Sequence, residues 1–305
     1  MTKIQRILAA IRGAPVDKIP KGEFYLEDDL IAKLLQIGYS NYSGITDFES
    51  KVKACELLGL DALVFSPNRV AGEMPWVELK RWREQSDFFL FALIDGPFQG
   101  VSQSYSDFTT FLMDTVREKE KIADLERKVI QGSTKLGLEA LEAGAHGILI
   151  ADDIAYQHGL YVSPSIMREL FFPYVKELIQ TLTLQAERIS GTKVPVFFHS
   201  DGNILQVLAD LTKLGFDGIH SLEPVMDIGK VREVTEDKVC LMGGFDLGWF
   251  DSRGVSKAIE LLNTVLSGGS YIFGSSAGIL DASLLAPEVL KVYRFVNEYE
   301  LKNKP

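Results

Sequence analysis

The segment VPVFFHSD, residues 194–201, is an apolar run that ends in a histidine and an aspartate. A second run of this kind, HGILIAD, occupies residues 146–152. Neither run alternates apolar and polar residues, so each is typical of a strand whose two faces are both covered. Sheets of such strands are parallel and carry helices on their faces, so we expect an α/β fold.

The same pattern continues in both directions from residues 194–201. Short β-branched and aromatic runs alternate with amphipathic segments, of which Glu118–Ala143 and Pro164–Ile189 are the longest, and Ser163 is a favourable N-cap for the second. Eight parallel strands predict closure into a (β/α)8 TIM barrel, a single domain over residues 1–305. The expected strands are Pro20–Leu26, Ala62–Ser66, Phe88–Ile94, Gly147–Asp152, Val194–His199, Gly218–Leu222, Val239–Gly243 and Tyr271–Gly274.

An open, doubly wound sheet is the alternative fold. It would usually carry a glycine fingerprint after an early strand, and the sequence contains none. The one glycine cluster, MGGFDLG at Met242–Gly248, follows the seventh expected strand, where a tight turn also explains it.

Composition narrows the class of protein. The chain has 305 residues, 46% of them hydrophobic, and a net charge of −10. This charge, without a Lys/Arg stripe, argues against a nucleic-acid partner, and no apolar run is long enough for a membrane span. The first residues lack a signal-peptide cleavage site, and the only cysteines, Cys55 and Cys240, fall in an expected helix and strand. We therefore expect a cytoplasmic protein.

Polar side chains follow every expected strand. Active sites of such barrels are built at the carboxyl ends of the strands and in the loops that follow them. The residues at these ends are Glu23, Ser66, Asp95, Asp152 with Asp153, His199 with Asp201, Glu223, Asp246, and Ser275 with Ser276. We expect the reaction centre around His199, Asp201 and Glu223.

His199 and Asp201 are two residues apart, so in an extended strand their side chains share one face. A carboxylate beside an imidazole fixes its tautomer and raises its proton affinity, which suits acid–base work. Asp201 could instead cap the helix expected to begin near Asn203. Glu223 is expected in the site because an acid at a strand end is costly unless it is paired or used.

Other residues are open to two interpretations. Asp152 and Asp153 point to opposite faces, so only one can enter the mouth, and we count Asp152 among the catalytic candidates without a pattern that decides between them. His220 is expected in the barrel wall, and His146 at the opposite end of the barrel. Gly96–Phe108 could be a lid over the substrate or an ordinary solvated loop.

A further set of polar and aromatic residues could contact substrate. Aromatic side chains near the mouth could grip a flat ring, although such residues are as often part of the barrel wall. The expected substrate contacts are Glu23, Tyr25, Asp95, Phe98, Tyr156, Asp246 and Ser276.

Several of these segments resemble the uroporphyrinogen decarboxylase superfamily, and most closely its corrinoid-dependent methyltransferase branch. The segments are RILAAIRGAPVDKIP (6–20), ADDIAYQHGLYVSP (151–164), FFHSDGN (197–203), GFDGIHSLEP (215–224), GGFD (243–246) and SYIFGSSAGI (270–279). The resemblance covers essentially the whole chain and implies an eight-stranded barrel. Decarboxylases of the family use an arginine-rich segment after the first strand and an aspartate after the second, whereas this chain has GEFYLEDD and FSPN.

The resemblance also bears on metal binding. Thiol-methylating members of the family hold zinc with a His-x-Cys pair and a distant cysteine. This chain keeps the histidine as His199, but has Asp201 at the first cysteine position and Ser276 or Ala277 near the second. The resemblance therefore implies, at most, a harder zinc site made by His199, Asp201 and Glu223.

The expected function follows from these substitutions. We expect a methyltransferase that moves a methyl group from a small O-methyl donor, such as a methoxylated aromatic in an O-demethylation, to the cobalt of a corrinoid (cobalamin) carried by a partner protein. The alternatives are a tetrapyrrole decarboxylase and a non-catalytic barrel that only binds a corrinoid or tetrapyrrole.

Overall fold

Eight parallel strands form the centre of the protein in a computed structural model that describes residues 1–38, 44–70, 72–267 and 270–301. Their order is β1-β3-β4-β5-β8-β9-β10-β11, and a parallel bridge between Lys21 and Phe273 closes the ring. The predicted TIM barrel is thus confirmed, with a strand at each expected position. The strands are β1 (Gly22–Glu23), β3 (Ala62–Phe65), β4 (Phe89–Asp95), β5 (Gly147–Ala151), β8 (Val196–His199), β9 (Gly218–His220), β10 (Cys240–Met242) and β11 (Tyr271–Ile272).

Apolar side chains fill the barrel interior, and a helix closes its lower end. Phe89, Phe197 and Met242 belong to one buried cluster that also includes Ile7 and Ala10 of α1 (Lys3–Ile11). α1 is held at the amino-terminal ends of the strands, because Arg6 forms an ion pair with Asp61, the residue before β3. The open end of the barrel is therefore the end where the strands finish.

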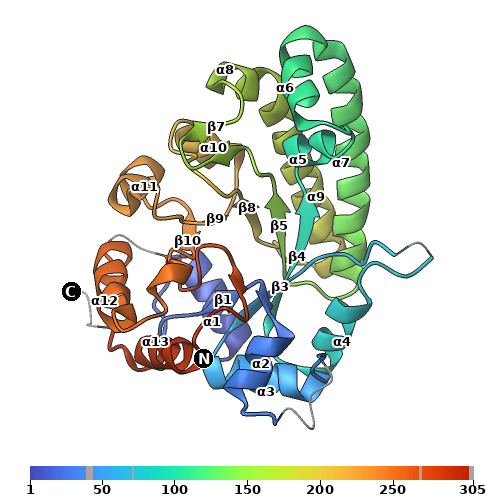
Figure 1. The fold of residues 1–305 in the computed structure, drawn as a ribbon. Helices are drawn as coiled ribbons and strands as arrows, with labels where there is room; N and C mark the ends of the chain where they lie inside the picture. The colour runs from blue at the N-terminus through green and yellow to red at the C-terminus, as the bar shows by residue number, and fades with distance from the viewer. Residues whose placement is uncertain (39–43, 71, 268–269, 302–305) are drawn as a thin grey trace.

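The outer helices are taller on one side of the barrel. Helices α6, α7 and α9 rise well above the carboxyl ends of β4 and β5 (Figure 1). None of the described helices is both long and apolar enough to cross a membrane. The outer helices are α2 (Asp28–Leu34), α3 (Phe48–Leu58), α4 (Val77–Gln85), α5 (Pro97–Ser102), α6 (Phe108–Arg117), α7 (Lys119–Glu142), α8 (Pro164–Ile166), α9 (Phe172–Ser190), α10 (Leu208–Leu214), α11 (Ile228–Thr235), α12 (Gly254–Val265) and α13 (Ala286–Glu298).

Two small sheets lie outside the main barrel sheet. A hairpin is formed by β6 (Ala155–Tyr156) and β7 (Gly159–Leu160), and β2 (Tyr25–Leu26) pairs with β12 (Ile279–Leu280). Both follow main strands, the first after β5 and the second after β1 and β11. They add structure on the side of the barrel where we expected the site.

Two helical predictions need correction. The first half of Gly96–Phe108 is helical and not a loop, because Pro97 begins α5, in which Phe98 and Val101 are buried. Only residues 103–107 connect α5 to α6 without helical structure. Proline is favourable in the first turn of a helix, since its missing N–H would have no partner there. The predicted helix Pro164–Ile189 is interrupted by a π-helical turn at Met167–Phe171, just before Pro173, whose ring cannot donate the next backbone hydrogen bond.

Candidate active site

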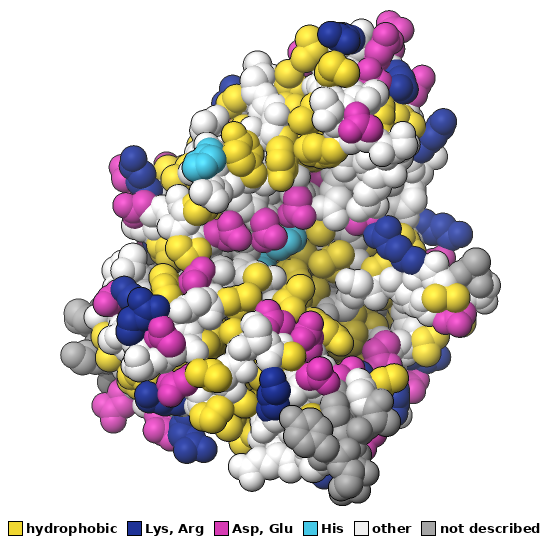
Figure 2. Space-filling view, viewed as in Figure 1, with side chains coloured by type: hydrophobic (Ala, Val, Ile, Leu, Met, Phe, Trp, Pro, Cys, Tyr) yellow, Lys and Arg dark blue, Asp and Glu magenta, His cyan; other side chains and the backbone are white. Residues whose placement is uncertain are grey.

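A hollow in the surface lies above the ends of the strands. The space-filling view shows a histidine inside this hollow, beside a row of acidic side chains (Figure 2). Because the lower end of the barrel is closed, this hollow is the place where the sequence-predicted groups can meet a ligand.

His199, Asp153 and Asp201 converge at the ends of β5 and β8. His199 Nε2 lies 3.7 Å from Asp153 Oδ1 and 4.0 Å from Asp201 Oδ1. One ligand atom from each of the three residues lies within 4.8 Å of the others. The His199 side chain is 10% exposed, whereas those of Asp153 and Asp201 are 43% and 49% exposed, so the imidazole is at the base of the site and the carboxylates are at its rim.

Hydrogen bonds hold the two carboxylates in this position. The Asp201 backbone N–H donates to Asp153 Oδ1 at 3.0 Å, and the Ser221 hydroxyl donates to Asp201 Oδ1 at 3.1 Å. Asp201 does not cap a helix, because α10 begins only at Leu208. The alternative structural explanation for Asp201 is therefore wrong.

Glu223 lies at the edge of this cluster. Its Oε2 accepts a hydrogen bond of 3.0 Å from the Gly202 N–H, in the loop that carries Asp201. Burial raises the pKa of Glu223, and the charge of Asp201 raises it further. Glu223 is thus electrostatically part of the site, although it is not in the three-residue group formed by His199, Asp153 and Asp201.

Burial dominates the electrostatics of the imidazole. It lowers the pKa of His199, and the opposing effects of Asp201 and Asp153 are smaller. The net direction is opposite to the one predicted from the neighbouring carboxylates alone. Burial and Asp153 raise the pKa of Asp201. These directions favour a neutral imidazole beside an Asp201 carboxyl that holds a proton more tightly than usual.

A second histidine lies directly behind the first. The strand register pairs His199 with His220, and their Nδ1 atoms are 2.8 Å apart. His220 is buried in the barrel wall, as predicted, and the ring of Phe24 packs against both imidazoles. The contact between the two rings was not predicted.

The two neighbouring aspartates after β5 have different environments. Asp152 is fully buried, and its Oδ1 accepts a hydrogen bond from the Gln99 N–H of α5. Burial raises the pKa of Asp152 to about 8. Asp153, not Asp152, is the residue beside His199.

Asp95 joins the site through a glutamine. The side-chain Nε2 of Gln99 lies 3.5 Å from Asp95 Oδ1, and its Oε1 accepts a hydrogen bond of 3.2 Å from the backbone N–H of Asp153. Asp95 also forms an ion pair with Arg69. Gln99 therefore connects the ends of β4 and β5.

Several expected substrate contacts are buried or structural. Glu23 is fully buried, accepts hydrogen bonds from Tyr293 and Ser275, and has a pKa raised by burial to about 7. Ser276 is also buried, and Asp246 caps the short helix Leu247–Trp249.

The expected aromatic contacts differ in exposure. Phe98 is buried, where it packs against Phe111 and Phe171. Tyr25 and Tyr156 are exposed, and Tyr156 stacks on Tyr161 beside the β6–β7 hairpin. Of these three residues, the two tyrosines are therefore the ones with free surface for a ligand.

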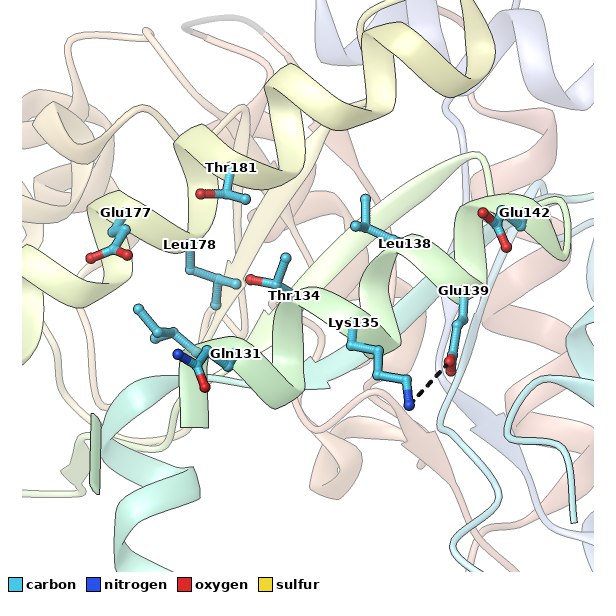
Figure 3. Close-up of a pocket in the computed structure, with 10 residues that line it drawn as sticks. Gln131, Thr134, Lys135, Leu138, Glu139, Glu142, Glu177, Leu178 and Thr181 are labelled. Atoms are coloured by element: carbon cyan, nitrogen blue, oxygen red, sulfur yellow. Dashed lines mark ion pairs between the residues drawn. The ribbon is translucent and has the colours of Figure 1, made fainter. Parts of the chain in front are cut away.

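A separate groove runs along the outside of the barrel. It has a volume of about 450 Å³ and lies between α7 and α9, with Gln131, Thr134 and Leu178 among its lining residues (Figure 3). An ion pair between Lys135 and Glu139 lies along one edge. This groove is on the helical layer and not at the strand ends, so we do not associate it with the reaction centre.

The donor set at the mouth fits a metal ion with mixed nitrogen and oxygen ligands. One imidazole nitrogen and two carboxylate oxygens are ligands that zinc accepts, and four-coordinate catalytic zinc keeps one position for water or substrate. A thiolate is not among them, because Cys55 and Cys240 lie in α3 and β10 and burial raises the pKa of each thiol to about 12.

Comparison with known proteins agrees with this geometry. The family model described as uroporphyrinogen decarboxylase (URO-D) matches residues 69–288. The chain belongs to this family. A uroporphyrinogen decarboxylase from Chlorobium phaeobacteroides is 31% identical over 212 residues, which cover 67% of this chain but only 55% of that relative.

The similarity to methyltransferases extends over more of the chain. Methylcobamide:CoM methyltransferase MtaA from Methanosarcina barkeri is 21% identical, with 90% of this chain and 91% of that protein covered. The solved structure of a methyltransferase from Methanosarcina mazei has a TM-score of 0.74 at 19% identity and covers 98% of this chain and 99% of its own, which establishes the common fold. The resemblance to the methyltransferase branch of the superfamily is confirmed.

Proposed function

We propose that this protein is a methyltransferase that moves a methyl group from a small O-methyl donor to the cobalt of a corrinoid carried by a separate protein. The observation that carries the proposal is the convergence of His199, Asp153 and Asp201 at the mouth of a barrel whose full-length relatives include a methylcobamide methyltransferase. A methoxylated aromatic is the donor class that we favour, which makes the reaction an O-demethylation.

The proposed reaction requires stabilisation of the leaving oxygen atom. When reduced cobalt attacks the methyl carbon, a cobalt–carbon bond forms with the electron pair of the metal, and the carbon–oxygen bond breaks with its pair on oxygen. The departing phenolate or alkoxide must then be stabilised by a proton or a Lewis acid. The proposed site has an acid with a raised pKa, Glu223, and three residues that would hold a Lewis-acidic metal ion.

Different residues of the site would stabilise the leaving oxygen in different ways. Glu223 is a suitable proton source, because its raised pKa increases the fraction that carries a proton near neutral pH. His199, Asp153 and Asp201 would hold zinc, which when bound supplies Lewis acidity to the leaving oxygen. The exposed tyrosines Tyr156 and Tyr161 offer ring surface for an aromatic donor.

The ligand set supports an acceptor other than a free thiol. A soft zinc site uses thiolates, and this chain has Asp201 where the resemblance would place the first cysteine and Ser276 or Ala277 near the second. The acidic mouth also disfavours a tetrapyrrole with many carboxylates, because like charges repel.

The decisive experiment is an assay of methyl transfer. Purified protein is mixed with a corrinoid carrier in the cob(I)alamin state and a panel of methyl ethers, and methylcobalamin formation is followed by absorbance. We expect turnover with at least one methyl ether, loss of turnover in His199→Ala, and normal turnover in Lys135→Ala, which changes the outer groove. Release of carboxyl groups from a supplied tetrapyrrole, without methyl transfer, would contradict the proposal.

A further inference from the structure

The side chain of Phe24 reaches across the mouth of the barrel. The preceding residue, Glu23, points outward, because its carboxylate accepts a hydrogen bond from Tyr293 of the outer helix α13. Successive side chains of an extended chain point to opposite sides, so Phe24 is directed inward. Its ring centroid lies 5.2 Å from that of His199, whose strand β8 is fourth from β1 in the ring of eight and therefore lies opposite β1.

The Phe24 ring forms part of the floor of the hollow. It packs on the buried cluster that fills the barrel interior and includes Phe197 and Met242. Its centroid is also 4.4 Å from that of the His220 ring. Phe24 is nevertheless only partly buried, so a portion of its apolar ring stays open beside His199. Hydrophobic surface is visible next to the histidine inside the hollow (Figure 2).

The chain around Phe24 is held in place by the loop that follows β11. The backbone N–H groups of Phe24 and Tyr25 donate to the carbonyl of Gly278 at 2.7 Å and 3.1 Å. Gly278 has a φ of +72°, and a Cβ there would lie 2.7 Å from Phe24 Cγ, so the glycine packs directly on the ring. The ring therefore does not have to be ordered when a ligand binds, which favours affinity.

We propose that Phe24 is a specificity-determining residue that contacts the ring of an aromatic methyl donor. The inference rests on the proposed function and assigns the selection of its substrate class to one side chain. The hollow has two chemically different parts, with the carboxylates of Asp153 and Asp201 at the rim and the Phe24 ring at the floor. Polar groups in a pocket fix the orientation of a ligand, and apolar surface covers its carbon skeleton. The donor oxygen therefore faces the acidic residues, and the donor ring contacts Phe24.

An aromatic donor gains more from this contact than a saturated donor of the same size. Two aromatic rings that pack edge to face or offset attract each other through their charge distributions, which adds about 2- to 10-fold in affinity beyond the buried apolar area. A saturated ring buries similar area against Phe24 but lacks this contribution. Phe24 should therefore favour anisole over methoxycyclohexane, two methyl ethers with the same number of carbon atoms.

Ligand binding in the absence of a corrinoid tests this inference, because no methyl transfer then occurs. The probe is 4-fluoroanisole, whose ¹⁹F NMR signal changes on binding, and anisole and methoxycyclohexane are added as competitors. We expect the wild type to bind anisole more tightly than methoxycyclohexane. In Phe24→Leu, which keeps an apolar side chain, the affinity for anisole should fall by about 2- to 10-fold, and that for methoxycyclohexane should change little.

The matched control is Phe295→Leu. Phe295 is also a partly buried phenylalanine, but it lies on the outer helix α13, where its ring packs against Tyr299. Both affinities should be the same in this variant as in the wild type. A change in the ratio of the two affinities in both leucine variants would contradict a specific role of Phe24.

The ratio of the two affinities separates ligand recognition from a general effect on folding. A structural defect in Phe24→Leu would weaken anisole and methoxycyclohexane by the same factor, whereas loss of a ring contact weakens anisole alone. An unchanged ratio in Phe24→Leu would overturn the inference. So would a wild-type protein that does not bind 4-fluoroanisole.

The inference and the proposed reaction can fail separately. A ratio that changes in Phe24→Leu, in a protein whose wild type transfers no methyl group, would support the role of Phe24 and contradict only the reaction. Methyl transfer from an aryl methyl ether with the same KM in wild type and Phe24→Leu would contradict the role of Phe24 and support the reaction.

Discussion

At the scale of single residues, Asp152 and Asp153 show how one position along the chain changes the chemistry of a carboxylate. Asp153 is partly exposed beside His199, whereas Asp152 is turned into the protein under α5. Deeper still, Glu126 of α7 is fully buried, and neither of its carboxyl oxygens has a partner among the described residues. These three acids should respond differently to substitution.

Asp153→Asn tests the rim of the site. The amide is a poorer metal ligand and removes one negative charge beside His199, so we expect methyl transfer to fall by about 10-fold or more with little change in stability. The matched control is Asp124→Asn, an exposed aspartate on α7 that pairs only with Arg127 at the surface. Equal rates in the two variants would remove Asp153 from the proposed site.

Glu126→Gln tests the buried acid. Burial, and to a smaller extent Asp152, raises the pKa of Glu126 to about 10 from an ordinary value of 4.5. Between these values the folded protein keeps a proton that the unfolded chain releases, so the free energy of unfolding falls as the pH rises.

The glutamine variant cannot lose a proton and should escape this fall. We expect its free energy of unfolding to gain about 1 to 3 kcal/mol on that of the wild type between about pH 5 and about pH 8. Urea unfolding at both pH values measures the difference. Parallel pH dependences in variant and wild type would show that Glu126 is not held protonated.

At the scale of elements, the loop after β8 and the β6–β7 hairpin depend on one glycine. Gly202 has a φ of +82°, and a Cβ there would come within 2.6 Å of the backbone of Ala155 and Tyr156. The Asn203 N–H donates to the Tyr156 carbonyl at 3.0 Å, so the two segments are in direct contact. This contact keeps the hairpin beside Asp201.

Gly202→Ala should disrupt this contact. We expect a loss of more than about 2 kcal/mol in the free energy of unfolding and a lower rate of methyl transfer, since both left-handed strain and a backbone clash are introduced. Gly191→Ala is the control, because Gly191 has a φ of +70° but open space around its Cβ position. It should cost only about 1 kcal/mol from the φ angle. A similar loss in both variants would mean that the clash is unimportant.

The elements also show what could be predicted from sequence. All eight strands lie where their apolar runs are, because a strand covered on both faces leaves a continuous apolar signal. The sequence pattern predicted secondary structure less well next to two prolines. Pro97 begins a helix in a segment predicted as a loop, and Pro173 follows a π-helical turn in a segment predicted as one regular helix.

The site was predictable only in outline. His199, Asp201 and Glu223 lie close together at the strand ends, as expected. Whether Asp152 or Asp153 faces His199 depends on how β5 ends, which periodicity does not determine. The pairing of His199 with His220 depends on the register between β8 and β9, which no feature of either strand specifies alone. The burial of Glu23 depends on Tyr293, which is 270 residues away in the chain.

At the scale of the whole molecule, acidic groups dominate the mouth. Asp153, Asp201 and Glu223 lie there, in a protein of net charge −10. A protein partner that covers the mouth would therefore be attracted through a basic surface, and such attraction weakens as salt screens it.

Salt should therefore affect the KM for a protein-bound corrinoid more than the KM for free cobalamin. Raising ionic strength from about 0.05 M to about 0.5 M is expected to raise the KM for a protein-bound corrinoid several-fold, because the Debye length shortens. The KM for free cobalamin should change far less, since that molecule presents no extended basic surface. A KM for the carrier that does not depend on salt would contradict docking over the acidic hollow.

The plugging of the lower barrel by α1 sets the order of events in any two-reactant chemistry here. Ile7 and Ala10 occupy the floor, so nothing enters or leaves from below. A donor and an acceptor that use the same entrance cannot enter or leave independently of each other. In the proposed reaction the smaller donor would have to bind before the carrier protein, and we expect its demethylated product to leave only after the carrier dissociates.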